Sequence, residues 1–189
     1  LFLLISTFLI SFFSIREWSL SRQSLLRVLN LHTAAVNALD LDTFFIYSAS
    51  GDRHVAVLPH THVAAPTRFP HPRGVASIRA HGGQIITGSG DGHVRVICTR
   101  SRDHRVLRGH VDIVRSVDAD ARRIASGSYD ATIKIWDGKR LLHTLAGHGS
   151  RVYCVHVGAT GVVSASVDGT VAFWDFAYNV PMARALIGE

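Results

Sequence analysis

Residues 126–130 read Ser126-Gly127-Ser128-Tyr129-Asp130. Trp136 lies six residues after this aspartate and is followed by Asp137. Versions of the same stretch occur at Ser48-Ala49-Ser50-Gly51-Asp52, Thr87-Gly88-Ser89-Gly90-Asp91 and Ser164-Ala165-Ser166-Val167-Asp168. A histidine precedes each of the four aspartates by 20 residues, at His32, His71, His110 and His148. Self-similarity at a period of nearly 39 residues indicates a repeat architecture, in which each copy folds as one small unit.

Each copy is predicted to contain four short strands. In the third copy these are residues 113–119, 123–128, 131–136 and 141–145. The stretch 132–135 alternates polar and apolar residues with period two, which is typical of a half-buried strand. Turn residues separate the strands, at 118–120, 128–130 and 137–138. Four strands in about 40 residues, with a Gly-His and a Trp-Asp pair, are the signature of a WD-repeat blade.

The repeats therefore predict an all-β fold, a partial WD40 β-propeller of about four four-stranded blades plus a fragment of a preceding blade. A closed propeller typically has 4–8 blades, so we expect an open arc that belongs to a larger propeller. The predicted boundaries are an apolar segment at 1–13, the end of a preceding blade at 14–31, repeats at 32–70, 71–109, 110–147 and 148–178, and a tail at 179–189.

The recurring polar residues are predicted to bond to one another inside each blade, because a buried histidine needs a partner for each ring nitrogen. Two repeats contain the full set of histidine, serine, aspartate and tryptophan: His110, Ser126, Asp130 and Trp136, and His148, Ser164, Asp168 and Trp174. Leu58 and Ile97 replace the tryptophan in the first two repeats, which should be held less firmly. We interpret these residues as structural rather than catalytic or metal-binding.

The net charge and the cysteines indicate the class of partner and the cellular compartment. The formal charge of +6 favours acidic partners, either a phosphoprotein, a nucleic acid or an anionic membrane. No basic run resembles a nucleic-acid arm, since the arginines are scattered through turns and strand ends. Cys98 and Cys154 have neither disulfide nor metal spacing, which predicts a cytoplasmic or nuclear protein.

The first thirteen residues carry no charge and are mostly Leu, Ile and Phe. They fit the apolar region of a signal peptide, without an initiator methionine or a basic leader, and they are too short for an ordinary membrane span. Two alternatives are buried strands of the preceding blade and translated non-coding sequence. We expect no membrane partner.

No enzyme motif is present: the sequence lacks a GxSxG elbow, a Walker loop, an HExxH and a CxxC. The Gly-rich residues 87–92 coincide with the strand-turn-strand of the other repeats, so we interpret them as a turn rather than a phosphate loop. We predict a protein without catalytic residues, cofactor, metal or small-molecule substrate.

Residues just after each repeat histidine are predicted to converge at the end of the innermost strands. The position five residues on holds Asn37, Ala76, Arg115 and Tyr153, and Arg73 and Arg151 follow their histidines by two or three residues. Tyr129, just before its turn aspartate, faces the same rim. Guanidinium groups bind phosphate bidentately and keep their charge at any working pH. Solvated surface arginines are the alternative.

The chain resembles the F-box and WD-repeat substrate receptors of cullin-type ubiquitin ligases, most of all their β-transducin repeat-containing members. The resemblance rests on 32–37, 48–53, 73–77, 114–117, 123–130 and 174–176, with Asn179 and Pro181 beyond. It runs from about Ser14 to Pro181 and covers what look like the last four of seven blades. The F-box and the first three blades of that family lie outside this match.

The resemblance implies that the top of the propeller binds a doubly phosphorylated degron peptide. The residues it implies for this role are Asn37, Arg73, Gly74, Ala76, Arg115, Tyr129 and Arg151. The partners would be phosphorylated substrate proteins, and a ligase adaptor if the full-length protein has an F-box. Two alternatives are a generic WD40 scaffold without phosphate preference and a nucleic-acid-binding propeller, whose affinity would fall steeply with salt.

Overall fold

The computed structural model describes residues 13–19, 21–61, 64–176 and 184–186. Over these residues the chain forms strands and turns and contains no helix. The strands are β1 (Ile15–Ser19), β2 (Ser24–Leu29), β3 (Val36–Leu41), β4 (Phe45–Ser50), β5 (His54–Pro59), β6 (Thr67–Pro70), β7 (Val75–His81), β8 (Gln84–Ser89), β9 (His93–Cys98), β10 (His104–Arg108), β11 (Val114–Ala119), β12 (Ile124–Ser128), β13 (Thr132–Trp136), β14 (Leu141–Ala146), β15 (Val152–Val157), β16 (Gly161–Ser166), β17 (Val171–Asp175) and β18 (Arg184–Leu186).

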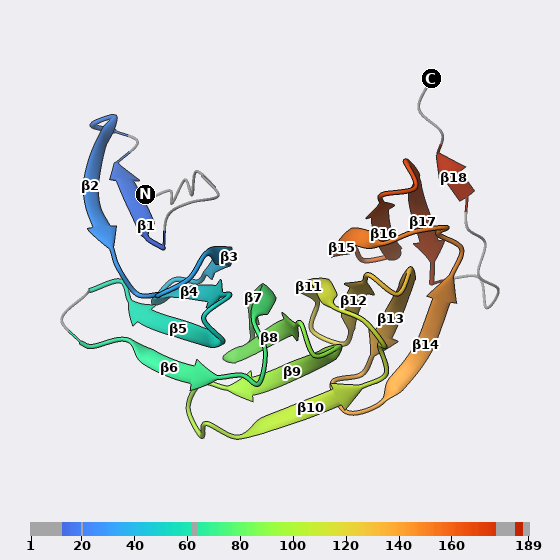
Figure 1. The fold of residues 1–189 in the computed structure, drawn as a ribbon, viewed down its shortest axis with the longest axis horizontal. Helices are drawn as coiled ribbons and strands as arrows, with labels where there is room; N and C mark the ends of the chain where they lie inside the picture. Colours follow the sequence, from blue (N-terminus) through green and yellow to red (C-terminus); the bar gives the residue numbers. More distant parts are fainter. Residues whose placement is uncertain (1–12, 20, 62–63, 177–183, 187–189) are drawn as a thin grey trace. The chain divides into compact units, whose positions relative to one another are not determined.

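The strands form four four-stranded antiparallel sheets, β3–β6, β7–β10, β11–β14 and β15–β18, and one two-stranded hairpin, β1–β2 (Figure 1). In every four-stranded sheet the strands follow one another in chain order, as in a propeller blade. The all-β prediction, the blades and the fragment of a preceding blade are thereby confirmed. The boundaries between repeats stay predictions, and residues 1–12, Asn179 and Pro181 lie outside the described part of the chain.

Each end of the four predicted strands of the third repeat lies within one residue of the corresponding end of β11–β14. The predicted turn at 118–120 was wrong in its first two residues, because β11 continues through Asp118 and Ala119. The turn that follows is tight: the amide of Asp120 donates to the carbonyl of Arg123 at 3.0 Å.

Among the described residues, no helix is long and apolar enough to span a membrane.

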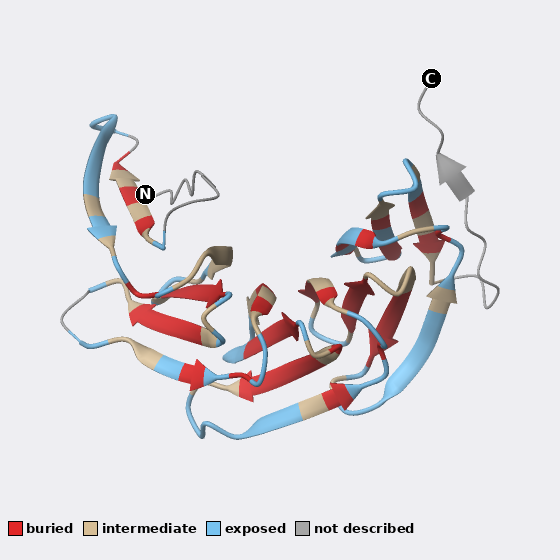
Figure 2. Cartoon of the chain, viewed as in Figure 1, coloured by how far each residue is buried: buried red, intermediate tan, exposed pale blue. Residues whose placement is uncertain are grey.

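The chain divides into two compact units, residues 1–75 and 76–189. In the first unit, Ile15 of the β1–β2 hairpin packs in one apolar cluster with Leu31, Ala56 and Leu58. Burial follows strand position in the sheet: β4 and β5 are almost entirely buried, whereas β2 is largely exposed (Figure 2). The apolar side chains of central strands therefore form the core of each blade.

In the second unit, neighbouring blades pack sheet against sheet. Ala125 and Ile133 of the third blade share one buried cluster with Val152 and Val155 of the fourth. Gly127 lies where a Cβ would come within 2.7 Å of Val152 Cγ1 and 2.8 Å of Val155 Cγ1. Glycine at this position lets two sheets approach closely, so the blades of this unit have a shared, tightly packed core.

Candidate functional site: an arginine and tyrosine cluster

The innermost strands of three blades each carry a β-bulge at the same place. The register shifts between Val36 and Ala38 in β3, between Val114 and Ser116 in β11, and between Val152 and Cys154 in β15. The residues left out of the pairing are Asn37, Arg115 and Tyr153. A bulge releases one residue from the ladder and changes the direction of its side chain, which explains why these positions can serve a site instead of a sheet face.

In the second unit, four side chains from two adjacent blades form one cluster. The rings of Tyr129 and Tyr153 meet edge to face, with centroids 5.5 Å apart. The guanidinium of Arg151 lies 4.9 Å from the centre of the Tyr129 ring, and that of Arg115 lies 5.9 Å from the centre of the Tyr153 ring. Each cation–π contact is worth about 0.5–1 kcal/mol at an exposed position. We call Arg115, Tyr129, Arg151 and Tyr153 the arginine–tyrosine cluster.

Backbone contacts hold the cluster in place. The amide of Tyr129 donates to the carbonyl of Ile113, and the carbonyl of Arg151 accepts from the amide of Val167, each at 3.0 Å. The guanidinium of Arg115 donates to the carbonyl of Ala76 on β7 at 3.4 Å. The cluster therefore draws on all three blades of the second unit.

The cluster carries two positive charges, those of Arg115 and Arg151. Over the described residues, neither Arg115 nor Arg151 forms an ion pair with a carboxylate. Burial and a hydrogen bond with Tyr153 raise the pKa of Tyr129, although the positive charge of Arg115 opposes the shift. Tyr129 consequently keeps its proton at neutral pH and can donate a hydrogen bond beside two permanent positive charges.

Of the seven residues implied for phosphopeptide binding, the structure brings four together: Arg115, Tyr129 and Arg151 in the cluster, and Ala76 through its carbonyl. The other three belong to the first unit. There, Asn37 donates to the carbonyl of Val75 at 2.8 Å, Arg73 is exposed and Gly74 is half-buried. A Cβ on Gly74 would lie 3.3 Å from Gly51 Cα, so close backbone packing inside the unit also explains this glycine.

Tyr153 was not among the seven, although its side chain completes the cluster. It is 44% exposed, and its ring lies between Arg115 and Tyr129. The available signal was its position, five residues after His148, which corresponds to Arg115 in the preceding repeat. The bulge that releases both residues is a feature of strand pairing, and the residue types alone do not indicate it.

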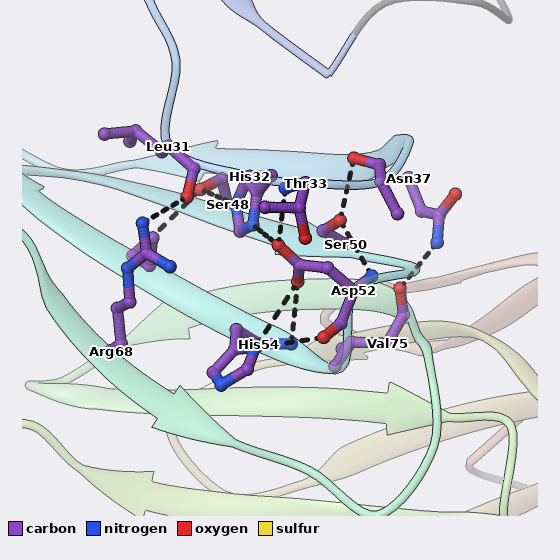
Figure 3. A network of polar contacts seen from close by, with 12 residues as sticks. Leu31, His32, Thr33, Asn37, Ser48, Ser50, Asp52, His54, Arg68 and Val75 are labelled. Atoms are coloured by element: carbon purple, nitrogen blue, oxygen red, sulfur yellow. Dashed lines mark hydrogen bonds and ion pairs between the residues drawn. The ribbon is translucent and has the colours of Figure 1, made fainter.

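The four repeat histidines are buried, and in the first, third and fourth blades each bonds to the aspartate and serine of its own blade. In the first blade, His32 contacts Asp52 at 2.9 Å and Ser48 at 2.8 Å, and the backbone amides of Thr33 and His54 donate to the Asp52 carboxylate (Figure 3). Both carboxylate oxygens of Asp52 thus accept hydrogen bonds within the blade, as expected of a structural residue.

In the third and fourth blades the same network gains a tryptophan. His110 contacts Asp130 and Ser126, both at 2.8 Å, and Trp136 donates its indole N–H to Ser126 at 2.9 Å. The matching contacts in the fourth blade are His148 with Asp168 at 3.1 Å, His148 with Ser164 at 2.8 Å, and Trp174 with Ser164 at 2.8 Å. The second blade adds an ion pair that the others lack, between buried Arg95 and Asp91.

Burial governs the protonation of these networks. It lowers the pKa of His110 despite the opposing contact with Asp130, so the imidazole is neutral at pH 7. Burial alone would raise the pKa of Asp130, but the hydrogen bond from Thr132 and the contact with His110 outweigh it and lower the pKa. His32 and Asp52 shift in the same two directions.

These shifts predict that acid destabilises the protein. The unfolded chain binds protons to His32 and His110 at a higher pH than the native chain, so the free energy of unfolding should fall as the pH drops below about 6.5. The aspartates add a second loss below about pH 4, because their native pKa lies under the unfolded one. Urea unfolding between pH 7.5 and 5 would measure the first slope. His110→Gln should make it shallower and His81→Gln, at an exposed position, should not; equal slopes would contradict this origin.

No group of three or more His, Cys, Asp or Glu side chains in the described part of the chain could hold a metal ion.

Comparisons with known proteins agree with the blade architecture. Residues 101–137 and 139–175 match the family model "WD domain, G-beta repeat". The chain is 39% identical over 71 residues to Cell division control protein 4 of Candida albicans, which covers 35% of this chain and 10% of that protein. It is 39% identical over 62 residues to THO complex subunit 6 of Drosophila melanogaster, which covers 32% of this chain and 18% of that protein. The matches thus span less than a fifth of either relative.

Proposed function

We propose that this chain, which contains WD40 repeats and is a protein-interaction domain, is the substrate-recognition part of a cullin-RING ubiquitin ligase and binds phosphorylated degron peptides. The observation that carries the proposal is the arginine–tyrosine cluster, in which two guanidinium groups are held against aromatic rings and have no carboxylate partner among the described residues. Support for the ligase context comes from the resemblance to F-box and WD-repeat receptors and from the similarity to Cell division control protein 4.

The cluster would select phosphate by charge and by geometry. A guanidinium presents a planar pair of donors that matches two phosphate oxygens, and each charge-assisted hydrogen bond contributes about 1.5–3 kcal/mol. The rings of Tyr129 and Tyr153 restrict the two arginines, so less side-chain entropy is lost when the peptide binds. The hydroxyl of Tyr129 can donate one further hydrogen bond to a phosphate oxygen.

The resemblance also implies peptide contacts for Asn37, Arg73, Gly74 and Ala76. In this role the chain catalyses no step; it holds a phosphorylated protein while other subunits transfer ubiquitin. A ligase adaptor would bind through an F-box elsewhere in the full-length protein. We place the protein in the cytoplasm, the nucleus or both, since phosphorylated substrates and reduced cysteines are found there.

The test is binding of a doubly phosphorylated degron peptide and its unphosphorylated counterpart, followed by fluorescence anisotropy. We expect Arg115→Ala to weaken binding of the phosphorylated peptide about tenfold or more, because one charge-assisted contact is lost. Arg108→Ala, on the outer strand β10, is the matched control and should leave the affinity unchanged. Equal binding of the two peptides by the unmodified protein would refute the proposal.

A second candidate is a generic WD40 scaffold for protein complexes, without preference for phosphate. The similarity to THO complex subunit 6, by its name a component of an assembly, favours it. Charge reversal at Arg115 and Arg151 separates the two functions, since a generic scaffold would keep its partners and a phosphate receptor would lose them.

A further inference from the structure

A second charged surface lies at the opposite end of the blades from the arginine–tyrosine cluster. In a four-stranded antiparallel meander, the first and third connections lie at one end of the sheet and the second connection at the other. Tyr129 belongs to the second connection of its blade, between β12 and β13. The first and third connections, residues 120–123 and 137–140, therefore lie at the far end, together with the β9–β10 connection, residues 99–103, of the preceding blade.

These three connections and the start of β10 concentrate basic side chains that are scattered in the sequence. We call this set the basic loop surface; it comprises Arg100, Arg102, Arg105, Arg122, Arg123, Lys139 and Arg140. All but Arg123 are exposed residues. The same segments contain three acidic residues, Asp103, Asp120 and Asp137. Basic residues still predominate when Asp118 and Asp175, at the nearby ends of β11 and β17, are included.

Two of those aspartates are occupied in shaping their own turns. One carboxylate oxygen of Asp120 accepts the backbone amides of Arg122 and Arg123, both at 2.7 Å. One oxygen of Asp137 accepts the amides of Lys139 and Arg140 at 2.9 and 2.8 Å. Such bonds fix the turn that presents the basic side chains. These carboxylates thus hold the backbone of their turns, and that of Asp137 also pairs with the exposed guanidinium of Arg140 at 2.9 Å.

A direct contact joins the loops of the two blades. The guanidinium of Arg105, on β10 of the second blade, donates to the carbonyl of Gly138 in the third blade at 2.6 Å. The β9–β10 connection is anchored as well, because Thr99 donates to the carbonyl of Gly83 and Cys98 accepts from the amide of Arg102. The Arg105 contact therefore holds β10 of the second blade next to the β13–β14 connection of the third blade.

The basic residues of these three connections are not found in the equivalent first connections of the neighbouring blades. The first connection of the second blade, residues 82–83, and that of the fourth, residues 158–160, contain no charged residue. In the first unit, the Asp42 turn has the same amide contacts as the Asp120 turn, but presents Phe44 and Phe45 where the latter presents Arg122 and Arg123. The turn geometry therefore does not require arginine, and the basic residues need another explanation.

We propose that the basic loop surface binds an acidic polypeptide segment, independently of the phosphopeptide site. Six of its seven basic residues are arginines, whose guanidinium groups pair bidentately with carboxylates. Binding of single-stranded nucleic acid also requires aromatic rings on which bases stack. Over the described residues these three connections contain no aromatic side chain, and the nearby ring of Phe176 is covered by the guanidinium of Arg123 at 3.7 Å. The surface thus favours carboxylates over bases.

The experiment measures binding of a fluorescein-labelled decaglutamate peptide to the full chain at low and at physiological salt. Arg122→Glu combined with Arg140→Glu should weaken binding about tenfold or more, since two attractive charges become repulsive. The control, Arg53→Glu combined with Arg108→Glu, makes the same change of net charge at exposed residues outside this surface and should have little effect. Arg115→Ala should leave decaglutamate binding intact, which separates this inference from the phosphopeptide proposal.

Three outcomes would overturn the inference: no binding of decaglutamate at low salt, equal losses in the two charge-reversal proteins, or tighter binding of an oligouridylate than of decaglutamate. Absence of binding would exclude acidic peptides as partners. Equal losses would show that only the net charge of the protein matters, and tighter oligouridylate binding would assign the surface to nucleic acid. Arg122→Gln with Arg140→Gln keeps the backbone contacts of both turns and should give a weaker loss in the same direction, which guards against misfolding as the cause.

Discussion

Trp136→Ala is expected to lower the free energy of unfolding by about 3–5 kcal/mol, the usual cost of removing a large buried aromatic side chain. Trp136 is 1% exposed and belongs to the apolar cluster shared by the second and third blades. Its indole N–H donates to Ser126 at 2.9 Å, and its ring meets His110 edge to face at 6.4 Å. The substitution therefore opens a cavity and removes a bond from the network around His110.

Urea unfolding of the full chain, followed by circular dichroism, measures the change. Trp136→Phe separates the two causes, because it keeps most of the buried ring and loses only the N–H; a smaller loss of about 1–2 kcal/mol is expected. Leu141→Ala, at a side chain that is 40% exposed, is the control and should cost much less. Similar losses for Trp136→Ala and Leu141→Ala would show that Trp136 does not anchor the blade.

The same comparison bears on the first two repeats, where Leu58 and Ile97 occupy the tryptophan position. Both side chains are buried, so the apolar packing is retained and only the indole hydrogen bond is absent. In the first blade, Ser48 still contacts His32 and is 3.4 Å from the carbonyl of Ala56. It stays a prediction that these repeats are held less firmly. The expected loss in the free energy of unfolding is similar to that of Trp136→Phe and smaller than that of Trp136→Ala.

Much of the fold could be predicted from the sequence because its signals are periodic. The strand alternation at residues 132–135 and the return of the same turn residues fix four strands per repeat, and β11–β14 agree closely. Chemically distinctive residues were equally informative: a histidine, a serine and an aspartate at constant spacing predicted partners for one another. Arg115, Tyr129 and Arg151 could be grouped for the same reason, since repeats align equivalent positions.

Contacts that depend on strand register or on loop conformation could not be predicted. Tyr153 was expected at the same rim as Arg115, but its contacts with the Tyr129 ring and the Arg115 guanidinium depend on a β-bulge that releases it from pairing. Arg95 pairs with Asp91 from a strand position that holds Ala56, Lys134 or Ala172 in the other repeats, so no repeat pattern indicated it. The basic loop surface was not predicted, because its arginines are separated along the chain and come together only through the turns of two blades.

Asp118 was assigned to a turn, yet it joins the innermost strands of all three blades in the second unit. Its carboxylate lies 3.0 Å from Arg79 Nε on β7 and 2.7 Å from His156 Nδ1 on β15. It also accepts the amides of Ala119 at 2.9 Å and Val157 at 2.8 Å. The residue is only 5% exposed, so the two amide hydrogen bonds and the ion pair with Arg79 compensate the burial of its charge.

Asp118→Ala is therefore expected to cost about 2–4 kcal/mol, because it leaves two buried amides without an acceptor and separates three strands that share one carboxylate. Asp118→Asn should cost less, since the amide oxygen can still accept hydrogen bonds. The network can be tested by a double-mutant cycle of Asp118→Ala with Arg79→Ala, in which a shared interaction gives a non-additive result. Additive losses would mean that the blades hold together through their apolar cores alone, and that the carboxylate contributes only within its own strand.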